Sequence, residues 1–362
     1  MKVSIGSSVV KGPWGGGNLF IINFKNFLLQ KGIKVIHDLS ESDIDVIILT
    51  DPRKRSESSS TFNHIDIEKY KKYVNPNVLV IQRINECDER KGTSGVNSLY
   101  LEASNSADHV FFVSSWLRDI YLKLGMPKEK TSVIMAGADT SIFNNSNMNE
   151  FNTENIKFIT HHWSAHYNKG FEIYKQFDEL LSQSKYKNLS FTYVGNVKDS
   201  IKFKNVIVKK PISGLDIAKE LKRHDIYITA SINEPSGNHH IEAAQCGLPI
   251  LYKESGGITE YCKGYGVGFD KNFEDALNEI IQNFNLYKFN LKNYPFNSNK
   301  MSKEILSLIK LLKDKKEKME YTTDFKSKLL YIFNQKILKF YIQLDSLQRN
   351  IKIFIKKLIL KS

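Results

Sequence analysis

The feature that most constrains this chain is an alternation of strand-like and helix-like segments that begins twice. Short apolar runs are separated by longer segments in which apolar residues recur at helical spacing. Alternation of this kind predicts parallel sheets covered by helices on both faces. The strand-like runs are residues 2–9, 33–39, 44–50, 78–84 and 109–114 in the first series, and 156–160, 189–194, 206–208, 225–230 and 248–252 in the second.

A polar stretch separates the two series. Residues 144–155, NNSNMNEFNTEN, have the composition of a linker with little to bury. We therefore expect an α/β protein with two doubly wound domains facing a cleft, residues 1–145 and 146–300, and a helical extension over 301–362. A length of 362 residues agrees with two domains. In such sheets ligands bind at the carboxyl ends of strands, beside helix N-termini.

The extension carries much of the positive charge. The whole chain has a net charge of +13, and residues 321–362 hold nine Lys or Arg against two Asp. This excess predicts an acidic partner at that end, and the rest of the chain lacks the features of a nucleic-acid-binding protein. Apolar residues with a spacing of 3.5 run from Leu330 to Leu358. They fit an amphipathic helix on an anionic membrane surface, coiled-coil self-association, or docking on the protein body.

Composition also limits the compartment. Three cysteines are too few for a disulfide framework, so they read as reduced thiols. The chain has no run of about 18 apolar residues, so we expect no membrane span. Its start, MKVSIGSSVV, lacks a secretory signal. We expect a cytoplasmic protein, peripheral at the inner membrane face if the extension binds lipid.

Residues 226–262, IYITASINEPSGNHHIEAAQCGLPILYKESGGITEYC, hold the most information about chemistry. A strand is followed by a loop and then by a helix. The backbone N–H groups of Ser236, Gly237 and Asn238 open that helix, where free donors at a positive dipole end suit a phosphate.

Two glutamates flank this helix start. Glu234 lies in the loop, and Glu242 lies inside the helix, where a carboxylate accepts hydrogen bonds from sugar hydroxyls. The alternative is a capped surface helix with two unrelated glutamates. The strand–loop–helix context and the Cys-Gly-Leu-Pro exit favour the ligand site.

Residues 234–250, EPSGNHHIEAAQCGLPI, resemble the donor-site pattern of family 4 of the glycosyltransferases, E-G-F-G-L-P-x-x-E-A-x-A-x-G-x-P-V. These are retaining enzymes of GT-B architecture, which pairs two Rossmann-like domains. The resemblance extends over about residues 1–290, including V-S-S-W-L-R-D at 113–119 and V-I-M-A-G-A-D at 133–139. The matching positions of the donor pattern are Glu234, Gly237, Glu242, Ala243, Gly247 and Pro249.

The resemblance implies a role for each matched residue. Lys169 is similar to the family's donor lysine, which with the N–H groups near Gly237 neutralises the donor pyrophosphate. Glu242 is implied to bind the ribose and Glu234 the donor sugar. The resemblance further implies a UDP- or GDP-linked sugar as donor substrate, no resident cofactor and no obligatory metal.

The chain departs from the family pattern in three places. Pro235 and Ser236 replace the usual Gly-Phe pair of the sugar-contacting turn, which leaves the donor sugar open. The segment Thr160–Ser164 has no arginine where the family supplies a second phosphate cation, so a histidine or backbone donors are possible substitutes. The family's acceptor-side histidine is also missing from the loop after residue 84.

The first half of the chain supplies the acceptor side. Gly16 and Gly17 follow the first strand-like run and open a helix, so their N–H groups point into the expected cleft. Asn85 and Glu86 follow another strand end and are candidates for contact with the acceptor hydroxyl. Front-face transfer lets the leaving phosphate accept the acceptor proton, so no strong protein base is required.

Other candidate sites are weak. Asp43 and Asp45 form a D-x-D pair, but at a strand entry far from the two glutamates. Adjacent histidine pairs at 161–162 and 239–240 point about 100° apart on a helix, so a zinc site is disfavoured against packing or hydrogen bonding. Cys246 lies beside a helix end and reads as a core residue.

Together these observations predict a glycosyltransferase that moves a sugar from a nucleotide diphosphate sugar to a hydroxyl of a glycan or lipid-linked glycan, with retention. Two alternatives remain open. One is another GT-B enzyme, a phosphorylase or a sugar-nucleotide epimerase. The other is a non-catalytic sugar-nucleotide-binding subunit of a glycan assembly complex.

Overall fold

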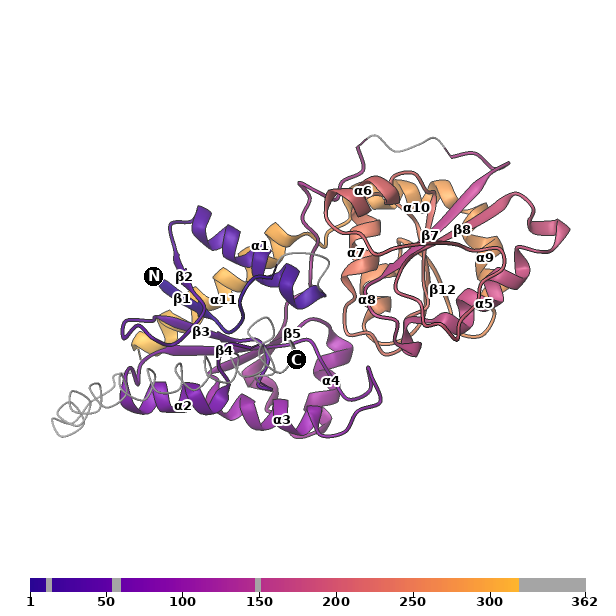
Figure 1. Ribbon diagram of the computed structural model, residues 1–362. Coiled ribbons are helices and arrows are strands. Elements are labelled where there is room, and N and C mark those ends of the chain that lie inside the picture. The colour runs from indigo at the N-terminus through magenta and orange to yellow at the C-terminus, as the bar shows by residue number, and fades with distance from the viewer. Residues whose placement is uncertain (11–14, 54–59, 147–150, 319–362) are drawn as a thin grey trace, which may run out of the picture.

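The computed structural model describes residues 1–362 apart from 11–14, 54–59, 147–150 and 319–362. Over these described residues the chain forms two parallel six-stranded sheets, each at the centre of its own domain (Figure 1). Helices cover both faces of each sheet, because the strands are apolar on both sides. The expected α/β class with two doubly wound domains is therefore confirmed.

The first sheet has the order β2-β1-β3-β4-β5-β6. The order reverses between β1 and β3, which opens a crevice at the carboxyl ends of these two strands. Its strands are β1 (Lys2–Ile5), β2 (Lys34–Ile36), β3 (Val46–Leu49), β4 (Leu79–Ile84), β5 (His109–Phe112) and β6 (Thr131–Val133). Its helices are α1 (Gly16–Gln30), α2 (His64–Tyr73), α3 (Val96–Ala103) and α4 (Ser115–Lys123).

The second sheet has the order β12-β11-β10-β7-β8-β9, with the reversal between β7 and β10. Its strands are β7 (Ile156–His162), β8 (Leu189–Gly195), β9 (Ile207–Lys209), β10 (Ile226–Thr229), β11 (Ile250–Lys253) and β12 (Gly266–Phe269). Its helices are α5 (Phe171–Leu180), α6 (Leu215–Leu221), α7 (Asn238–Gln245), α8 (Ile258–Cys262), α9 (Phe273–Gln282) and α10 (Phe284–Asn290). Short 3-10 helices are η1 (Ser104–Ser106), η2 (Lys128–Lys130), η3 (Tyr167–Lys169), η4 (Ser184–Tyr186) and η5 (Leu291–Asn293).

After the second domain the chain returns to the first. Helix α11 (Ser298–Lys318) packs beside α1 on the first sheet, as the yellow-orange helix in Figure 1 shows. Its side chains Met301, Ile305 and Ile309 are buried with Phe24 of α1. The two connections between the domains lie side by side, since Ala138 forms a bridge with Asn297. The first part of the expected extension thus completes the core of the first domain.

Several expectations about organisation stay predictions. The domain limits 1–145, 146–300 and 301–362 are not fixed by these contacts, and the apolar seam from Leu330 to Leu358 lies outside the described residues. Strands β6 and β12 were not predicted; β12 contains Gly266 and Gly268, and glycine is depleted in strands. No helix in the described part of the chain is long and apolar enough to cross a membrane.

Candidate active site

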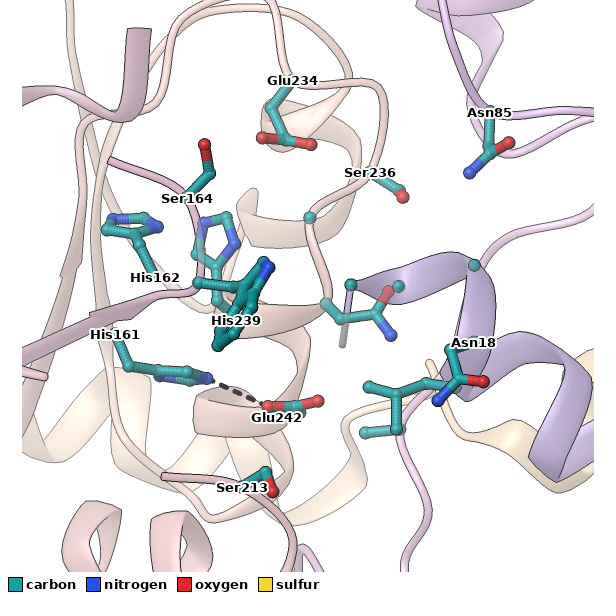
Figure 2. Close-up of a pocket in the computed structure, with 18 of the residues that line it drawn as sticks. Asn18, Asn85, His161, His162, Ser164, Ser213, Glu234, Ser236, His239 and Glu242 are labelled. Atoms are coloured by element: carbon teal, nitrogen blue, oxygen red, sulfur yellow. Dashed lines mark hydrogen bonds and ion pairs between the residues drawn. The ribbon is translucent and has the colours of Figure 1, made fainter. Parts of the chain in front are cut away.

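A cavity of about 970 Å³ lies between the two domains and is lined by both. It opens where the carboxyl ends of β1, β3 and β4 face those of β7 and β10, which is where doubly wound sheets hold ligands. In Figure 2, Asn18 and Asn85 approach from the first domain, and Glu234, Glu242 and His161 come from the second. All the predicted site residues line this one cavity: Gly16, Gly17, Asn85, Glu86, Lys169, Glu234, Ser236, Gly237, Asn238 and Glu242.

The N-terminus of α7 forms the centre of the second domain's wall. Gly237 precedes the helix with a φ of 79°, a left-handed conformation that favours glycine. A Cβ there would come within 2.7 Å of His240 Cε1. The N-terminus of α1 approaches from the opposite domain, since a Cβ on Gly16 would lie 3.0 Å from Asn238 Oδ1. Two helix N-termini therefore meet at the cavity, and both favour an anion.

Glu242 lies one turn inside α7 and is almost fully buried. Its Oε2 is 3.0 Å from Nε2 of His161, the next-to-last residue of β7 (Figure 2). The ring of His161 packs edge-on against Tyr227 of β10, and the Tyr227 hydroxyl is 3.2 Å from His161 Nδ1. Buried contacts therefore fix the carboxylate at the cavity wall.

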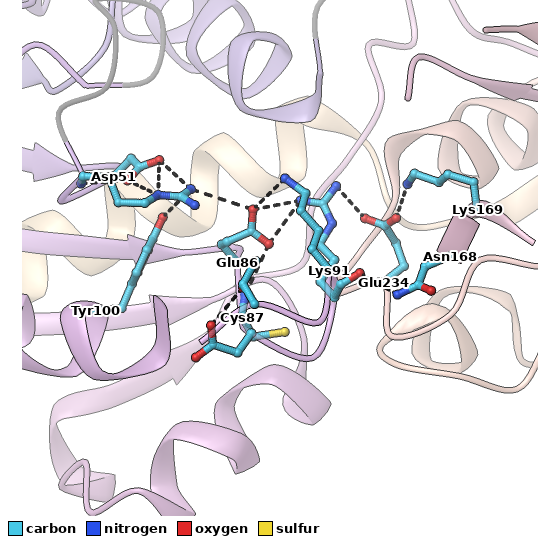
Figure 3. A network of polar contacts seen from close by, with 12 residues as sticks. Asp51, Glu86, Cys87, Lys91, Tyr100, Asn168, Lys169 and Glu234 are labelled. Atoms are coloured by element: carbon cyan, nitrogen blue, oxygen red, sulfur yellow. Dashed lines mark hydrogen bonds and ion pairs between the residues drawn. The ribbon is translucent and has the colours of Figure 1, made fainter. Parts of the chain in front are cut away.

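Glu234 lies between two cations from different domains. Lys169 Nζ pairs with its Oε2, and Arg90 Nη2 is 3.1 Å from its Oε1 (Figure 3). Burial alone would raise the pKa of Glu234, but Arg90 and Lys169 outweigh it and hold that pKa well below the usual range. Glu234 is therefore ionised at neutral pH, so it accepts hydrogen bonds and does not act as a general acid.

Local packing positions Lys169. It ends η3, and Gly170 follows with a φ of 93°. A Cβ on Gly170 would lie 2.5 Å from the Cβ and carbonyl oxygen of Ala230, so only glycine permits this approach to the end of β10. The close approach brings the lysine beside the loop that carries Glu234.

Glu86 is the centre of the charge network on the first domain's wall. Its Oε2 is 3.3 Å from Arg90 Nη1, 3.5 Å from Lys91 Nζ and 3.7 Å from Arg53 Nη2 (Figure 3). Arg53 also forms a two-pronged pair with Asp51, with a shortest distance of 2.7 Å. Arg90 thus joins the carboxylates of both domains into one network.

Further contacts hold the domains together beside this network. Asn168 Nδ2 donates to the carbonyl oxygen of Arg90 at 3.1 Å, and Asn233 Nδ2 donates to that of Glu89 at 3.1 Å. Glu260 of α8 accepts from two backbone N–H groups at the start of α4, each at 2.8 Å. The loop after β4 is therefore anchored to both elements that carry Lys169 and Glu234.

Three buried histidines lie behind the α7 N-terminus. The ring of His239 is 4.7 Å from that of His162 and 4.9 Å from that of His240, centroid to centroid. Burial lowers the pKa of each, that of His240 to about 3, so all three are neutral at pH 7. Both ring nitrogens of His240 lack a hydrogen-bond partner within the part of the chain that the structure describes. The pairs at 161–162 and 239–240 thus serve packing and hydrogen bonding.

The D-x-D pair lies away from the cavity. Asp43 pairs with Lys2, and Asp45 pairs with Lys313 of α11 at 2.7 Å, before β3 begins. Cys246 is buried in the core of the second domain, as expected. In the described parts of the chain no group of three or more His, Cys, Asp or Glu is placed to hold a metal. Whether the reaction needs a metal ion stays a prediction.

The sequence did not predict Arg90 as a partner of Glu234. The two residues are 144 positions apart, so no local motif connects them. The absence of an arginine from residues 160–164 could have indicated that another segment supplies the second cation. The pairing of His161 with Glu242 likewise required the fold.

Comparison with known proteins agrees with this geometry. Residues 147–289 match the family of glycosyl transferases group 1. No curated protein gives a significant sequence match. HepE of Anabaena, solved with UDP and glucose, is similar in structure, with a TM-score of 0.60 at 14% identity over 85% of this chain and 99% of that one.

Two further solved structures have the same architecture. A sucrose-phosphate synthase from Thermosynechococcus elongatus has a TM-score of 0.61 at 13% identity, covering 86% of this chain and 98% of its own. A glycosyltransferase from Rickettsia africae has a TM-score of 0.57 at 17% identity, with coverages of 86% and 98%. At such identities the likeness shows the fold, which is GT-B.

The fold is that of the GT-B class, and the sequence match over residues 147–289 points to the nucleotide-sugar glycosyltransferases within that class. Over residues 147–289 the chain is similar to the family of glycosyl transferases group 1. The family resemblance inferred from the Glu234–Ile250 pattern is thereby confirmed.

Proposed function

We propose that this protein transfers a sugar from a nucleotide diphosphate sugar to a hydroxyl of a glycan or lipid-linked glycan, with retention of configuration. The observation that carries the proposal is the cluster of Lys169, Arg90 and the α7 N-terminus at one end of the cavity, with Glu242 one turn further along. A diphosphate needs cations and N–H donors, and a ribose needs a hydrogen-bond acceptor beside them.

Each group has a defined part in this proposal. The diphosphate binds at Ser236, Gly237 and Asn238, and Lys169 neutralises it. Arg90 supplies the second cation from the opposite domain and takes the place of the arginine that residues 160–164 lack. Glu242 accepts from the ribose hydroxyls after exchanging its bond to His161.

Transfer then proceeds on the face of the sugar that the leaving group occupies. Ionised Glu234 accepts hydrogen bonds from the donor sugar, and Asn85 and Glu86 orient the acceptor hydroxyl across the cavity. The leaving diphosphate takes the hydroxyl proton as the glycosidic bond forms. Lys169 and Arg90 stabilise the negative charge that develops on it, which is where preorganised charges contribute most. The bound state of HepE, which holds UDP and glucose, is consistent with such a donor.

Nucleotide binding tests the proposal. Thermal unfolding is measured with UDP, GDP, ADP, CMP and inorganic phosphate, because a ligand at 100 times its Kd stabilises the native state by about 2.7 kcal/mol. We expect one diphosphate to raise the melting temperature, and Glu242→Ala to weaken its binding about 10- to 100-fold. Glu279→Ala, an exposed carboxylate on α9, is the matched control.

Other results would redirect the assignment. A shift with phosphate alone would favour a phosphorylase. Binding without release of sugar from any donor would favour a non-catalytic subunit. Unchanged UDP and GDP affinity in Glu242→Ala would remove the ribose role.

Membrane attachment through residues 330–358 is part of the proposal, and binding of the full chain to anionic vesicles is its test.

A further inference from the structure

Arg83 is a buried cation that the donor site does not use. It lies near the end of β4, two residues before Asn85, and it lines the cavity. Its side chain is on the same face of the strand as Leu79 and Ile81, which pack toward α1. The guanidinium carbon lies 4.2 Å from the ring centroid of Phe20 in α1, and the residue is 4% exposed.

Among the described residues, no carboxylate pairs with this guanidinium. The Arg83 side chain forms no hydrogen bond or ion pair with them, whereas the nearby Arg53 and Arg90 are each paired with two carboxylates. Burial lowers the pKa of Arg83 to about 10, and apart from burial only Tyr261 and Tyr100 shift it. Arg83 therefore stays charged at neutral pH and stands apart from the network around Glu234.

A buried charge without a partner is strongly unfavourable unless a ligand completes it. Stacking on Phe20 covers one face of the guanidinium. The edge of the group, where the N–H donors lie, stays uncovered by this ring. That edge suits two-pronged binding of a carboxylate or a phosphate. Because Lys169 and Arg90 already serve the donor diphosphate at Glu234, the anion for Arg83 has another source.

We propose that Arg83 binds an anionic group of the acceptor, a carboxylate or a phosphate, and so selects acidic acceptors over neutral ones. The inference rests on the proposed function, since it names the acceptor class of the same cavity. Arg83 lies on the acceptor wall, where β4 leads directly into Asn85. The carboxylate would come from an acidic sugar, and the phosphate from a sugar phosphate or a lipid diphosphate.

Equilibrium binding separates these sources. Calorimetry of the full chain, saturated with the nucleotide that stabilises it, compares neutral hexoses, hexuronates and hexose 6-phosphates of gluco, galacto and manno configuration. A short-chain prenyl diphosphate hexoside forms a fourth arm. We expect at least one anionic class to bind ten times more tightly than the neutral sugar of the same configuration, with an affinity that falls as salt rises.

Variants then assign the preference to Arg83. Arg83→Gln is expected to abolish the tenfold preference, and Arg83→Lys to retain part of it, because lysine keeps the charge without the fork. Arg223→Gln is the control, because Arg223 is an exposed arginine just after α6. If Arg83→Gln unfolds, two measurements still test whether Arg83 binds the anion. They are the partial loss of the preference for anionic sugars in Arg83→Lys and the salt dependence of sugar binding by the native protein.

Two results would overturn the inference. One is equal affinity for neutral and anionic sugars in the native protein. The other is a loss of nucleotide affinity in Arg83→Gln as large as the loss of sugar affinity, which would assign Arg83 to the donor. Failure of the proposed function reads differently: the protein would release no sugar from any nucleotide donor, while the preference for anionic sugars would still be measured.

Discussion

The two walls of the cavity balance their charges in different ways. On the second domain's wall, each carboxylate has a dedicated partner, Lys169 for Glu234 and His161 for Glu242. On the first domain's wall, Glu86 contacts three cations, of which Arg53 is also paired with Asp51 and Arg90 reaches across to Glu234. The second wall therefore pairs its carboxylates within its own domain, while the first wall also contributes a cation, Arg90, across the cavity.

This difference gives the domain contact a part in the site. Arg90 belongs to the first domain by chain position, and its ion pair with Glu234 joins it to the proposed donor site. Its carbonyl oxygen is held by Asn168, next to Lys169. Separation of the domains would remove the second cation from the diphosphate, so we expect donor binding and domain docking to reinforce each other.

The largest expected effect comes from the two cations that flank Glu234. Lys169→Ala should lower kcat by about 10²- to 10³-fold, the usual loss when one charge-stabilising group is removed. Arg90→Ala should lower it by about 10- to 100-fold, because a quarter of its side chain is exposed and water screens it more. Steady-state release of the nucleotide diphosphate measures both.

Lys175→Ala, an exposed lysine on α5, is the control for both variants. Full activity in Arg90→Ala alongside an inactive Lys169→Ala would mean that the second domain holds a complete donor site by itself. In that case the first wall would contribute no cation to donor binding at the second wall.

The second expected effect separates the two helix N-termini. Gly237→Ala introduces a Cβ against His240 and His239 at a φ of 79°, so the free energy of unfolding should fall by about 2 to 3 kcal/mol. Nucleotide affinity should fall with it. Gly17→Ala, on the opposite wall, places its Cβ in open space within α1 and should be neutral or stabilising by about 0.5–1 kcal/mol. Denaturant unfolding and calorimetry measure the pair, and equal destabilisation would show that the backbone at Gly237 relaxes.

The same difference explains what could be predicted from the sequence. The second wall comes mainly from one continuous segment, residues 226–262, so its strand, helix start and glutamates were found from spacing and family pattern. Lys169 was found from a short motif. Gly16, Gly17, Asn85 and Glu86 were placed because each follows a strand end, and parallel sheets bring such ends together.

What the sequence did not predict depends on contacts between distant segments. Whether Arg90 pairs with Glu86, Glu234 or solvent is set by how the domains dock, and no periodicity encodes that. The packing of α11 on α1 also joins the two ends of the chain. Residues 301–318 combine apolar residues with six lysines, a composition that fits a free amphipathic helix as well as a docked one.

The effect that is smallest at neutral pH, and grows only as the pH falls, concerns protons at the second wall. His162, His239 and His240 have lowered pKa values in the folded protein and ordinary values near 6.5 when unfolded. Below pH 6.5 the unfolded chain therefore binds more protons, and the free energy of unfolding falls as pH falls. Each histidine contributes a slope of about 1.4 kcal/mol per pH unit, down to about pH 3 for His240. Glu234 adds to this loss below its ordinary value of 4.5, since its pKa is also depressed.

Two single replacements turn this slope into a comparison of the domains. His240→Leu should reduce the pH dependence of unfolding at the cavity, and His109→Leu should reduce it at a buried site of the first domain, where burial lowers the pKa to about 4. A nucleoside diphosphate bound at the α7 N-terminus places negative charge beside His240 and raises its pKa. Bound nucleotide should therefore reduce the contribution of His240 to the pH dependence of the free energy of unfolding, because His240 in the folded protein then takes up its proton at a higher pH. The contribution of His109 should not change. His240→Leu and His109→Leu identify these two contributions, since each variant removes one of them. Equal responses of the two variants to nucleotide would contradict a diphosphate site at α7.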